Sequence, residues 1–278
     1  ALAAEPRQSL VVASGTGSGK TECFMVPILD RLVRQQADLG GCLVGVRALF
    51  LYPLNALINS QRERLRAWTH AFGGDIRFCL YNGNTPEHLP AAQAHRHPNE
   101  VHDRQALRDA PPPILVTNAT MLEYMLVRAV DAPILDQSQG SLEWVVLDEA
   151  HTYMGSQAAE LALLVRRVLH AFGVRPDEVR FVATSATIGD PQGEAGRHLR
   201  RFLGDVAGVG EDRVRLVAGT RQVPDLGPEP PPRTDASPLE DLEAIEPKVA
   251  AEAPAPDRFA ALLTHPLARA IRRRLLMP

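Results

Sequence analysis

A glycine-rich segment near the start of the chain carries residue types that can bind phosphate. The apolar residues 11–13 lead into Ser14, which is followed by Gly15, Thr16, Gly17, Ser18, Gly19, Lys20 and Thr21. Successive backbone N–H groups of such a turn can surround phosphate oxygens, and the positive end of a following helix adds to the attraction. Lys20 would reach the outer phosphates of a nucleoside triphosphate, and Thr21 would ligate Mg²⁺. The alternative is a flexible loop that happens to precede a helix. This alternative is disfavoured because Lys20 and Thr21 occur together with both flanking elements.

Two adjacent carboxylates follow another apolar segment. Residues 144–147 read WVVL, and Asp148, Glu149, an alanine and His151 come next. A carboxylate at the end of a strand can hold Mg²⁺ through its water shell, which is the role we predict for Asp148. Glu149 points elsewhere and is the candidate base that activates a water molecule. Solvated acids at a strand end are the alternative, and His151 has the alternative of a surface or capping histidine.

Strand-like and helix-like segments alternate along the chain and would position these residues. This alternation predicts an α/β fold with a parallel sheet covered by helices on both faces, in which ligands bind beyond the carboxyl ends of the strands. We expect strands at residues 9–13, 48–52, 77–81, 114–117, 144–147, 180–183 and 213–217. We expect a helix over residues 100–108 and further helices that begin near Gly19, Leu54, Ala119, Thr152 and Pro191.

The phosphate-binding and acidic segments, with a third block, resemble motifs I, II and III of superfamily 2 helicases in their DEAH form. Motif I corresponds to residues 14–21, motif II to residues 148–151 and motif III to Ser185, Ala186 and Thr187. The resemblance implies a RecA-like P-loop NTPase domain over about residues 9–217.

Further blocks between these motifs resemble one branch of the superfamily. Residues 52–57 with Gln61 resemble motif Ia. Residues 81–86, YNGNTP, resemble the YDGDTP element of the Hrq1/MrfA-like and Lhr-like DNA helicases, and residues 114–122 resemble their ILLTNPDML block. The blocks also resemble those of the very large helicase-like proteins of bacterial genome-defence clusters.

The resemblance implies further roles for residues at these motifs. Coupling of the nucleotide site to strand binding would fall to His151, Ser185 and Thr187. Contacts with the phosphate backbone of one strand, which carry no sequence information, would fall to Asn55, Thr117 and Asn118. The alternative for the serine and threonine of motif III is that they form a plain strand-to-turn connection. The alternative for the three residues expected at the strand backbone is that they are polar loop residues without a partner.

The chain departs from the family pattern at three positions. Leu54 replaces the usual threonine of motif Ia, and Asn82 and Asn84 replace the two aspartates of the YDGDTP element. These changes affect the expected strand contacts and leave the ATP chemistry untouched. The arginines that follow motif Ia are interpreted as a solvated helix face, namely Arg62, Arg64 and Arg66.

The chain is expected to divide near residue 222. Residues 225–257 carry nine acidic and two basic side chains, and nine prolines fall between residues 224 and 256. Such a segment cannot bury much apolar surface, so residues 223–257 are interpreted as an acidic, Pro-rich linker or disordered insertion. Residues 258–278 follow a helical pattern and would begin a further region. Residues 1–222 would then form the RecA-like domain.

The overall composition excludes several other classes of protein. The 278 residues are 45% hydrophobic and 23% charged, with a formal net charge of −3, so no global basic field indicates a histone-like binder of nucleic acid. The three cysteines form no CxxC pair, which argues against a zinc site and suits the reduced thiols of a cytoplasmic protein. No apolar run reaches about 18 residues, so no membrane span is expected.

These inferences predict the first motor domain of an ATP-dependent helicase or translocase, with ATP and Mg²⁺ as cofactors. Its expected partners are single-stranded DNA, or a duplex with a single-stranded tail, and a second RecA-like domain of the same longer chain, because no block after residue 217 resembles motifs IV to VI. An ATP-binding scaffold of a defence complex is the alternative, and the paired acids argue against it. A small P-loop nucleotide kinase would not require the other blocks in this order.

Overall fold

The computed structural model describes residues 7–15, 19–90, 97–153, 155–186, 193–219, 254–258 and 265. The chain divides into two compact units, residues 1–219 and residues 220–278. In the second unit, residues 255–258 are helical. The expected linker and the expected helix over residues 258–278 lie almost entirely outside the described residues, so both remain predictions.

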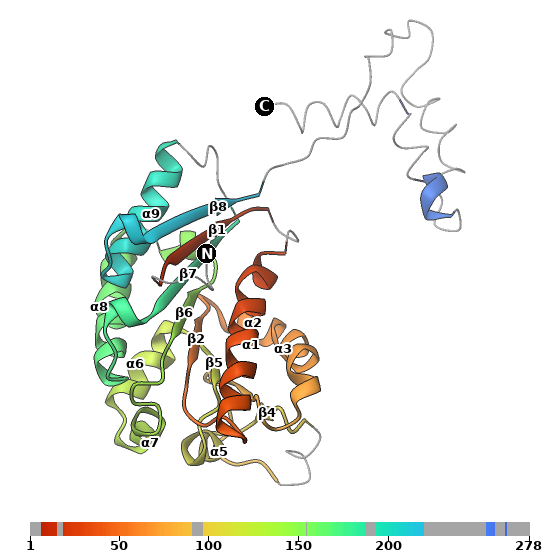
Figure 1. Ribbon diagram of the computed structural model, residues 1–278, viewed down its shortest axis with the longest axis vertical. Helices are drawn as coiled ribbons and strands as arrows, with labels where there is room; N and C mark the ends of the chain where they lie inside the picture. The colour runs from red at the N-terminus through yellow and green to blue at the C-terminus, as the bar shows by residue number, and fades with distance from the viewer. Residues whose placement is uncertain are drawn as a thin grey trace, which may run out of the picture. The chain divides into compact units, whose positions relative to one another are not determined.

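The first unit is built on an eight-stranded sheet in which every strand pair is parallel (Figure 1). Across the sheet the strands follow the order β4-β3-β5-β2-β6-β7-β1-β8. Their bounds are β1 Ser9–Ala13, β2 Ala48–Leu51, β3 Phe78–Leu80, β4 Glu100–Val101, β5 Ile114–Thr117, β6 Trp144–Leu147, β7 Arg180–Ser185 and β8 Val214–Ala218. The parallel sheet confirms the predicted fold class.

Helices cover both faces of this sheet, as predicted (Figure 1). One face carries α1 (Lys20–Leu39), α2 (Asn55–Ser60) and α3 (Arg62–Thr69). The other face carries α5 (Arg104–Asp109), α6 (Ala119–Val127), α7 (Ala132–Asp136), α8 (Ser156–Ala171) and α9 (Glu194–Ala207). No helix within the described ranges is both long enough and apolar enough to span a membrane.

The central strands β2 and β6 are apolar along their whole length because each face of the sheet has its own core. In β2, Phe50 packs in the core beneath α1, where its ring meets Phe24 edge-on at a centroid distance of 5.6 Å. Its neighbours Leu49 and Leu51 belong to the opposite core. Successive side chains of a strand point to opposite faces, so a sheet buried on both sides needs a continuous apolar run.

Two expected elements differ from the structure. Residues 100–108 do not form one helix: Glu100 and Val101 form β4, and α5 begins only at Arg104, where the Asp103 side chain accepts a hydrogen bond from the Ala106 N–H and caps the helix. The helix expected near Thr152 begins at residue 156, after a 3₁₀ turn over Ala150–Tyr153. The predicted strands differ from the observed ones by at most two residues at either end.

Candidate functional site

The phosphate-binding segment begins where β1 ends. Ser14 N–H donates to the Ser185 carbonyl of β7 at 3.2 Å, which joins the start of the loop to motif III. Gly19 caps α1 with φ of 83°, a left-handed conformation that strains any residue with a side chain. Strand, loop and helix therefore follow one another as the sequence predicts; three loop residues lie outside the described part of the chain, namely Thr16, Gly17 and Ser18.

The ammonium group of Lys20 lies over the backbone of this loop. Its Nζ donates to the Ser14 carbonyl at 2.8 Å and to the Gly15 carbonyl at 3.4 Å. The carbonyl groups of the loop thus hold the positive charge of Lys20 in place. Phosphate oxygens are stronger hydrogen-bond acceptors and can replace these carbonyls. The ammonium suits the phosphates of a nucleotide, and the hydroxyl of Thr21, in the first turn of α1, suits an Mg²⁺ ion.

The two acids lie at the carboxyl end of β6, which is separated from β1 by β7 alone. The hydroxyl of Thr184, a fully buried residue of β7, donates to the Asp148 carboxylate and accepts a hydrogen bond from the Glu149 N–H at 3.2 Å. One side chain therefore fixes both acidic residues. Thr184 was not predicted as a site residue; its position directly before Ser185 in motif III was the available signal.

Glu149 has an unusual backbone conformation. Its φ of 51° is the only positive value of a non-glycine residue within the described ranges. The turn is held by Thr152, whose N–H and hydroxyl donate to the Glu149 carbonyl at 2.9 and 2.8 Å. Such strain costs about 1–3 kcal/mol and is found at functional sites that need a side chain aimed in one direction.

His151 lies beside the carboxylate of Glu149. The distance from its Nδ1 to Oε2 of Glu149 is 3.3 Å, and its side chain is 37% exposed. The two groups are close, but Oε2 of Glu149 has no hydrogen-bond partner among the described residues. The coupling role expected for His151 stays a prediction, as does that of Ser185, which is buried at the end of β7. Thr187 lies outside the described residues.

Two buried tyrosines flank the acids. Burial raises the pKa of Tyr52 and of Tyr153, and the negative charge of Asp148 raises both further. Both phenols therefore stay protonated well above neutral pH, and neither adds negative charge beside the acids.

The residues expected to contact a nucleic-acid strand are only partly brought together. Asn118 donates from Nδ2 to Oδ1 of Asn55 at 2.7 Å, although 63 positions separate the two residues. Oδ1 of Asn118 also caps α6 by accepting from the Met121 N–H at 2.8 Å. Thr117, in contrast, is completely buried, so its side chain offers no surface to a strand and the contact predicted for it is not supported.

Residues 1–194 match the family model of the DEAD/DEAH box helicases. The chain belongs to this family of ATP-dependent helicases. The recurrence of Hrq1/MrfA-like and Lhr-like proteins among its relatives confirms the resemblance inferred from the motifs.

Three relatives illustrate the relationship. The Druantia protein DruE of Escherichia coli strain UMEA 4076-1 is 27% identical over an alignment that covers 78% of this chain and 17% of DruE. ATP-dependent helicase hrq1 of Schizosaccharomyces pombe is 27% identical, with 70% and 16% covered. The crystal structure of the DUF1998 helicase MrfA bound to DNA matches with a TM-score of 0.54 and 26% identity, over 76% of this chain and 25% of MrfA. The chain thus spans a quarter or less of these proteins.

The arginines after motif Ia of this helicase domain lie on a partly exposed helix face, as interpreted from sequence, but each also has a side-chain partner that the sequence did not predict. Arg62 and Arg66 both pair with Glu100, through Nε, at 3.1 and 2.6 Å. Arg64 instead reaches the first turn of α1, where its Nη1 donates to the Thr21 hydroxyl at 2.9 Å. The helical pattern of the sequence predicted α3. It could not predict these partners, because they belong to other elements and lie 34 to 43 positions away in the sequence.

Proposed function

We propose that the protein binds ATP with Mg²⁺ between the phosphate loop and the acids of motif II, and uses ATP hydrolysis to move along a DNA strand. One observation carries this proposal. The hydroxyl of Thr184 orients Asp148 and Glu149 together, at the same edge of the sheet as Lys20 and Thr21. This arrangement supplies a metal ligand and a base next to a phosphate-binding loop.

Each of these groups has a defined task in the proposed reaction. The Lys20 ammonium exchanges the Ser14 carbonyl for phosphate oxygens, and Thr21 and Asp148 are the residues that would hold Mg²⁺. When bound there, Mg²⁺ would supply positive charge against the charge that develops on the phosphates. Glu149 accepts a proton from the attacking water at its carboxylate, beside which His151 lies at 3.3 Å. An arginine finger from a second motor domain of the same longer chain would complete the site, a contribution of about 10³–10⁵ in rate in related phosphoryl transferases.

The proposed substrate is single-stranded DNA or a duplex with a single-stranded tail. The Asn55–Asn118 pair offers amide groups to a strand backbone, and the similar MrfA has been crystallised with DNA. The similarity to a Druantia protein supports a role in bacterial defence. A cytoplasmic location is part of this proposal. An ATP-binding scaffold without unwinding activity would have no use for the strained conformation of Glu149.

Strand displacement by the complete protein tests this proposal against the scaffold. A labelled duplex with a single-stranded tail should separate when ATP and Mg²⁺ are added and remain intact when ATP is omitted. ATP binding without any displacement or movement along DNA would favour the scaffold instead.

The contact of Arg64 with Thr21 leads to a prediction about Mg²⁺. The Arg64→Ala variant should need about threefold less Mg²⁺ for half-maximal ATP binding, because the guanidinium and the metal compete for one hydroxyl oxygen. Equilibrium titration of a fluorescent ATP analogue at rising Mg²⁺ measures this value without requiring catalysis. Arg34→Ala is the control, since Arg34 is an exposed arginine paired with Asp30 within α1. An unchanged Mg²⁺ requirement would exclude the competition.

A further inference from the structure

Tyr52 lies directly after β2, at the carboxyl edge of the sheet and beside the acids of motif II. In the register of the sheet, Leu51 of β2 pairs with Leu147 of β6, and the Asp148 N–H donates to the Leu51 carbonyl at 3.0 Å. Adjacent strands of a sheet are about 5 Å apart. One residue further on, Tyr52 and Asp148 are therefore neighbours at the ends of adjacent strands.

The side chains of Tyr52 and Asp148 lie on the same face of the sheet. Successive residues of a strand alternate between the two faces. Val146 belongs to the core beneath α1 and Leu147 to the opposite core, so the side chain of Asp148 returns to the α1 face. Tyr52 belongs to the core beneath α1 as well. The phenol thus shares its face with the proposed metal ligand of β6 and with the helix that carries the other proposed ligand in its first turn.

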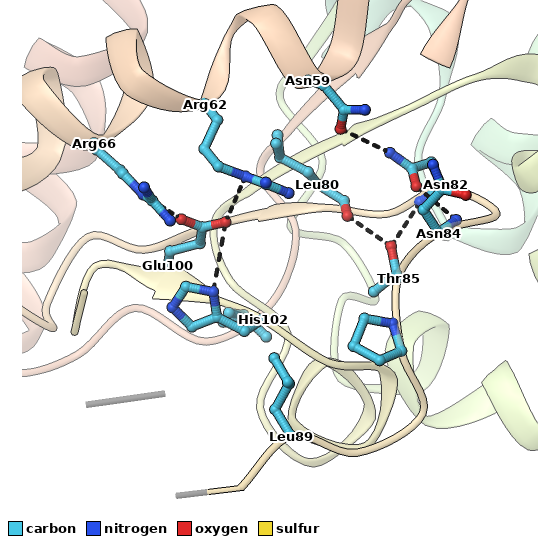
Figure 2. A pocket seen from close by; sticks show the side chains of 12 residues that line it. Asn59, Arg62, Arg66, Leu80, Asn82, Asn84, Thr85, Leu89, Glu100 and His102 are labelled. Carbon is cyan, nitrogen blue, oxygen red and sulfur yellow. Dashed lines mark hydrogen bonds and ion pairs between the residues drawn. The ribbon is translucent and has the colours of Figure 1, made fainter. Parts of the chain in front are cut away.

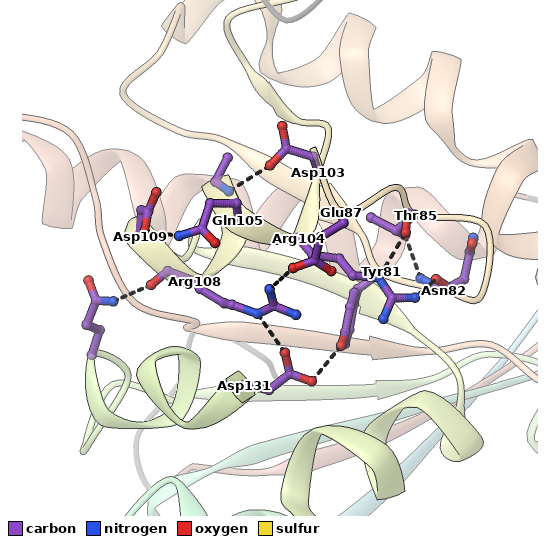
Figure 3. Close-up of polar contacts among 12 residues, drawn as sticks. Tyr81, Asn82, Thr85, Glu87, Asp103, Arg104, Gln105, Arg108, Asp109 and Asp131 are labelled. Atoms are coloured by element: carbon purple, nitrogen blue, oxygen red, sulfur yellow. Dashed lines mark hydrogen bonds and ion pairs between the residues drawn. The ribbon is translucent and has the colours of Figure 1, made fainter. Parts of the chain in front are cut away.

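The ring of Tyr52 is buried, but its hydroxyl forms no hydrogen bond with any residue that the structure describes. The residue is only 2% exposed. Tyrosine hydroxyls in buried positions usually have a partner. Tyr81 follows this rule, since its hydroxyl donates to Asp131 at 2.8 Å (Figure 3). The hydroxyl of Tyr52 is therefore available to a ligand.

Charged groups of the proposed nucleotide site act on this hydroxyl. Burial raises the pKa of Tyr52, the negative charges of Asp148 and Glu149 raise it further, and the positive charge of Arg64 lowers it. The phenol therefore keeps its proton at neutral pH. It can take part in hydrogen bonds beside the acids, but it does not bind a metal ion as a phenolate.

Arg64 is the cation that reaches this region from α3. Residues two positions apart on a helix differ in direction by roughly 200°. Arg62 and Arg66 accordingly turn to Glu100 (Figure 2), whereas Arg64 donates to the Thr21 hydroxyl at 2.9 Å. The guanidinium of Arg64 thus holds an oxygen that Mg²⁺ would take.

We propose that Tyr52 is a positioning residue of the Mg²⁺ site, whose hydroxyl forms a hydrogen bond with the water shell through which Asp148 would hold the ion. The assignment rests on the proposed function, because it supposes Mg²⁺ at Thr21 and Asp148. Mg²⁺ usually keeps several of its waters when it binds to a protein. Groups beyond the direct ligands typically change metal affinity by about 10- to 100-fold. Tyr52 supports the bound ion in this account, whereas Arg64 competes with it.

Equilibrium titration of a fluorescent ATP analogue at rising Mg²⁺ tests this role in the complete protein without requiring catalysis. Tyr52→Phe removes the hydroxyl and keeps the ring, so the packing beneath α1 should persist. The variant should need about tenfold more Mg²⁺ for half-maximal ATP binding. This change is opposite in sign to the decrease expected for Arg64→Ala. Binding of the analogue in EDTA should equal that of the wild type, because the hydroxyl acts only through the metal.

Tyr153→Phe is the matched control. The hydroxyl of Tyr153 is buried and also has no hydrogen-bond partner within the described ranges, but its ring belongs to the opposite core and approaches Asp148 from the other face of the sheet. This variant should keep the wild-type Mg²⁺ requirement.

Two results would overturn the assignment of Tyr52 alone: an unchanged Mg²⁺ requirement in Tyr52→Phe, or equal increases in Tyr52→Phe and Tyr153→Phe. A wild-type protein that does not bind the analogue, or binds it equally well in EDTA and in Mg²⁺, would overturn the assignment together with the proposed metal site.

Discussion

Replacing Glu149 by Gln is expected to slow DNA-stimulated ATP hydrolysis by the complete protein about 10²- to 10⁴-fold, the usual contribution of a general base. The amide is nearly isosteric with the carboxylate but cannot take the proton of the attacking water. The backbone turn and the contact with Thr184 run through main-chain atoms of residue 149, so the variant should keep them.

A measurement of ATP binding distinguishes a loss of catalysis in Glu149→Gln from a folding defect. Because the phosphate loop is unchanged, Glu149→Gln should bind a fluorescent ATP analogue as tightly as the wild type. Glu178→Gln is a suitable control, since Glu178 lies in a 3₁₀ turn before β7 and pairs with the exposed Arg175. A Glu149→Gln variant that hydrolyses ATP at the wild-type rate would exclude this residue as the base.

Asp131→Ala is expected to lower the free energy of unfolding by about 3–5 kcal/mol, the cost of breaking a buried ion pair. Asp131 is fully buried and accepts hydrogen bonds from Arg108 Nε at 2.9 Å and from the Tyr81 hydroxyl at 2.8 Å. Its loss leaves the buried guanidinium of Arg108 with Glu87 alone, and leaves a phenol without its acceptor.

Urea unfolding followed by circular dichroism measures this change. Asp30→Ala removes an aspartate from an exposed i,i+4 pair with Arg34 and should change the free energy of unfolding by less than about 0.5 kcal/mol. If the two substitutions changed the free energy of unfolding equally, the buried contacts of Asp131 would not stabilise the fold as expected.

The parts of the site that the sequence predicted are those whose chemistry requires fixed residue types at short spacing. The phosphate loop and the motif II acids each lie within one continuous segment, between a strand and a helix that the apolar pattern also predicts. Sequence reasoning could therefore name Lys20, Thr21, Asp148 and Glu149 together with the elements that carry them.

The parts that sequence reasoning missed depend on contacts between distant segments. Thr184 orients both acids only because β7 pairs with β6 in one register, which places it beside residues 35 and 36 positions away. Arg64 contacts Thr21, which lies 43 positions away in the sequence. The helical pattern of α3 predicts a helix but does not say which residues of other elements its polar side chains will contact. Thr117 resembles a backbone ligand within its motif, yet the packing of β5 buries it completely.

We propose that this chain is the ATP-driven motor domain of a DNA translocase, and ATP hydrolysis by the complete protein with and without single-stranded DNA tests this most directly. The wild type should hydrolyse ATP faster when DNA is added. Lys20→Ala should abolish this stimulated rate, since no other ammonium lies in the loop. Equal rates in the wild type and in Lys20→Ala, or no response of the wild type to DNA, would contradict the claim.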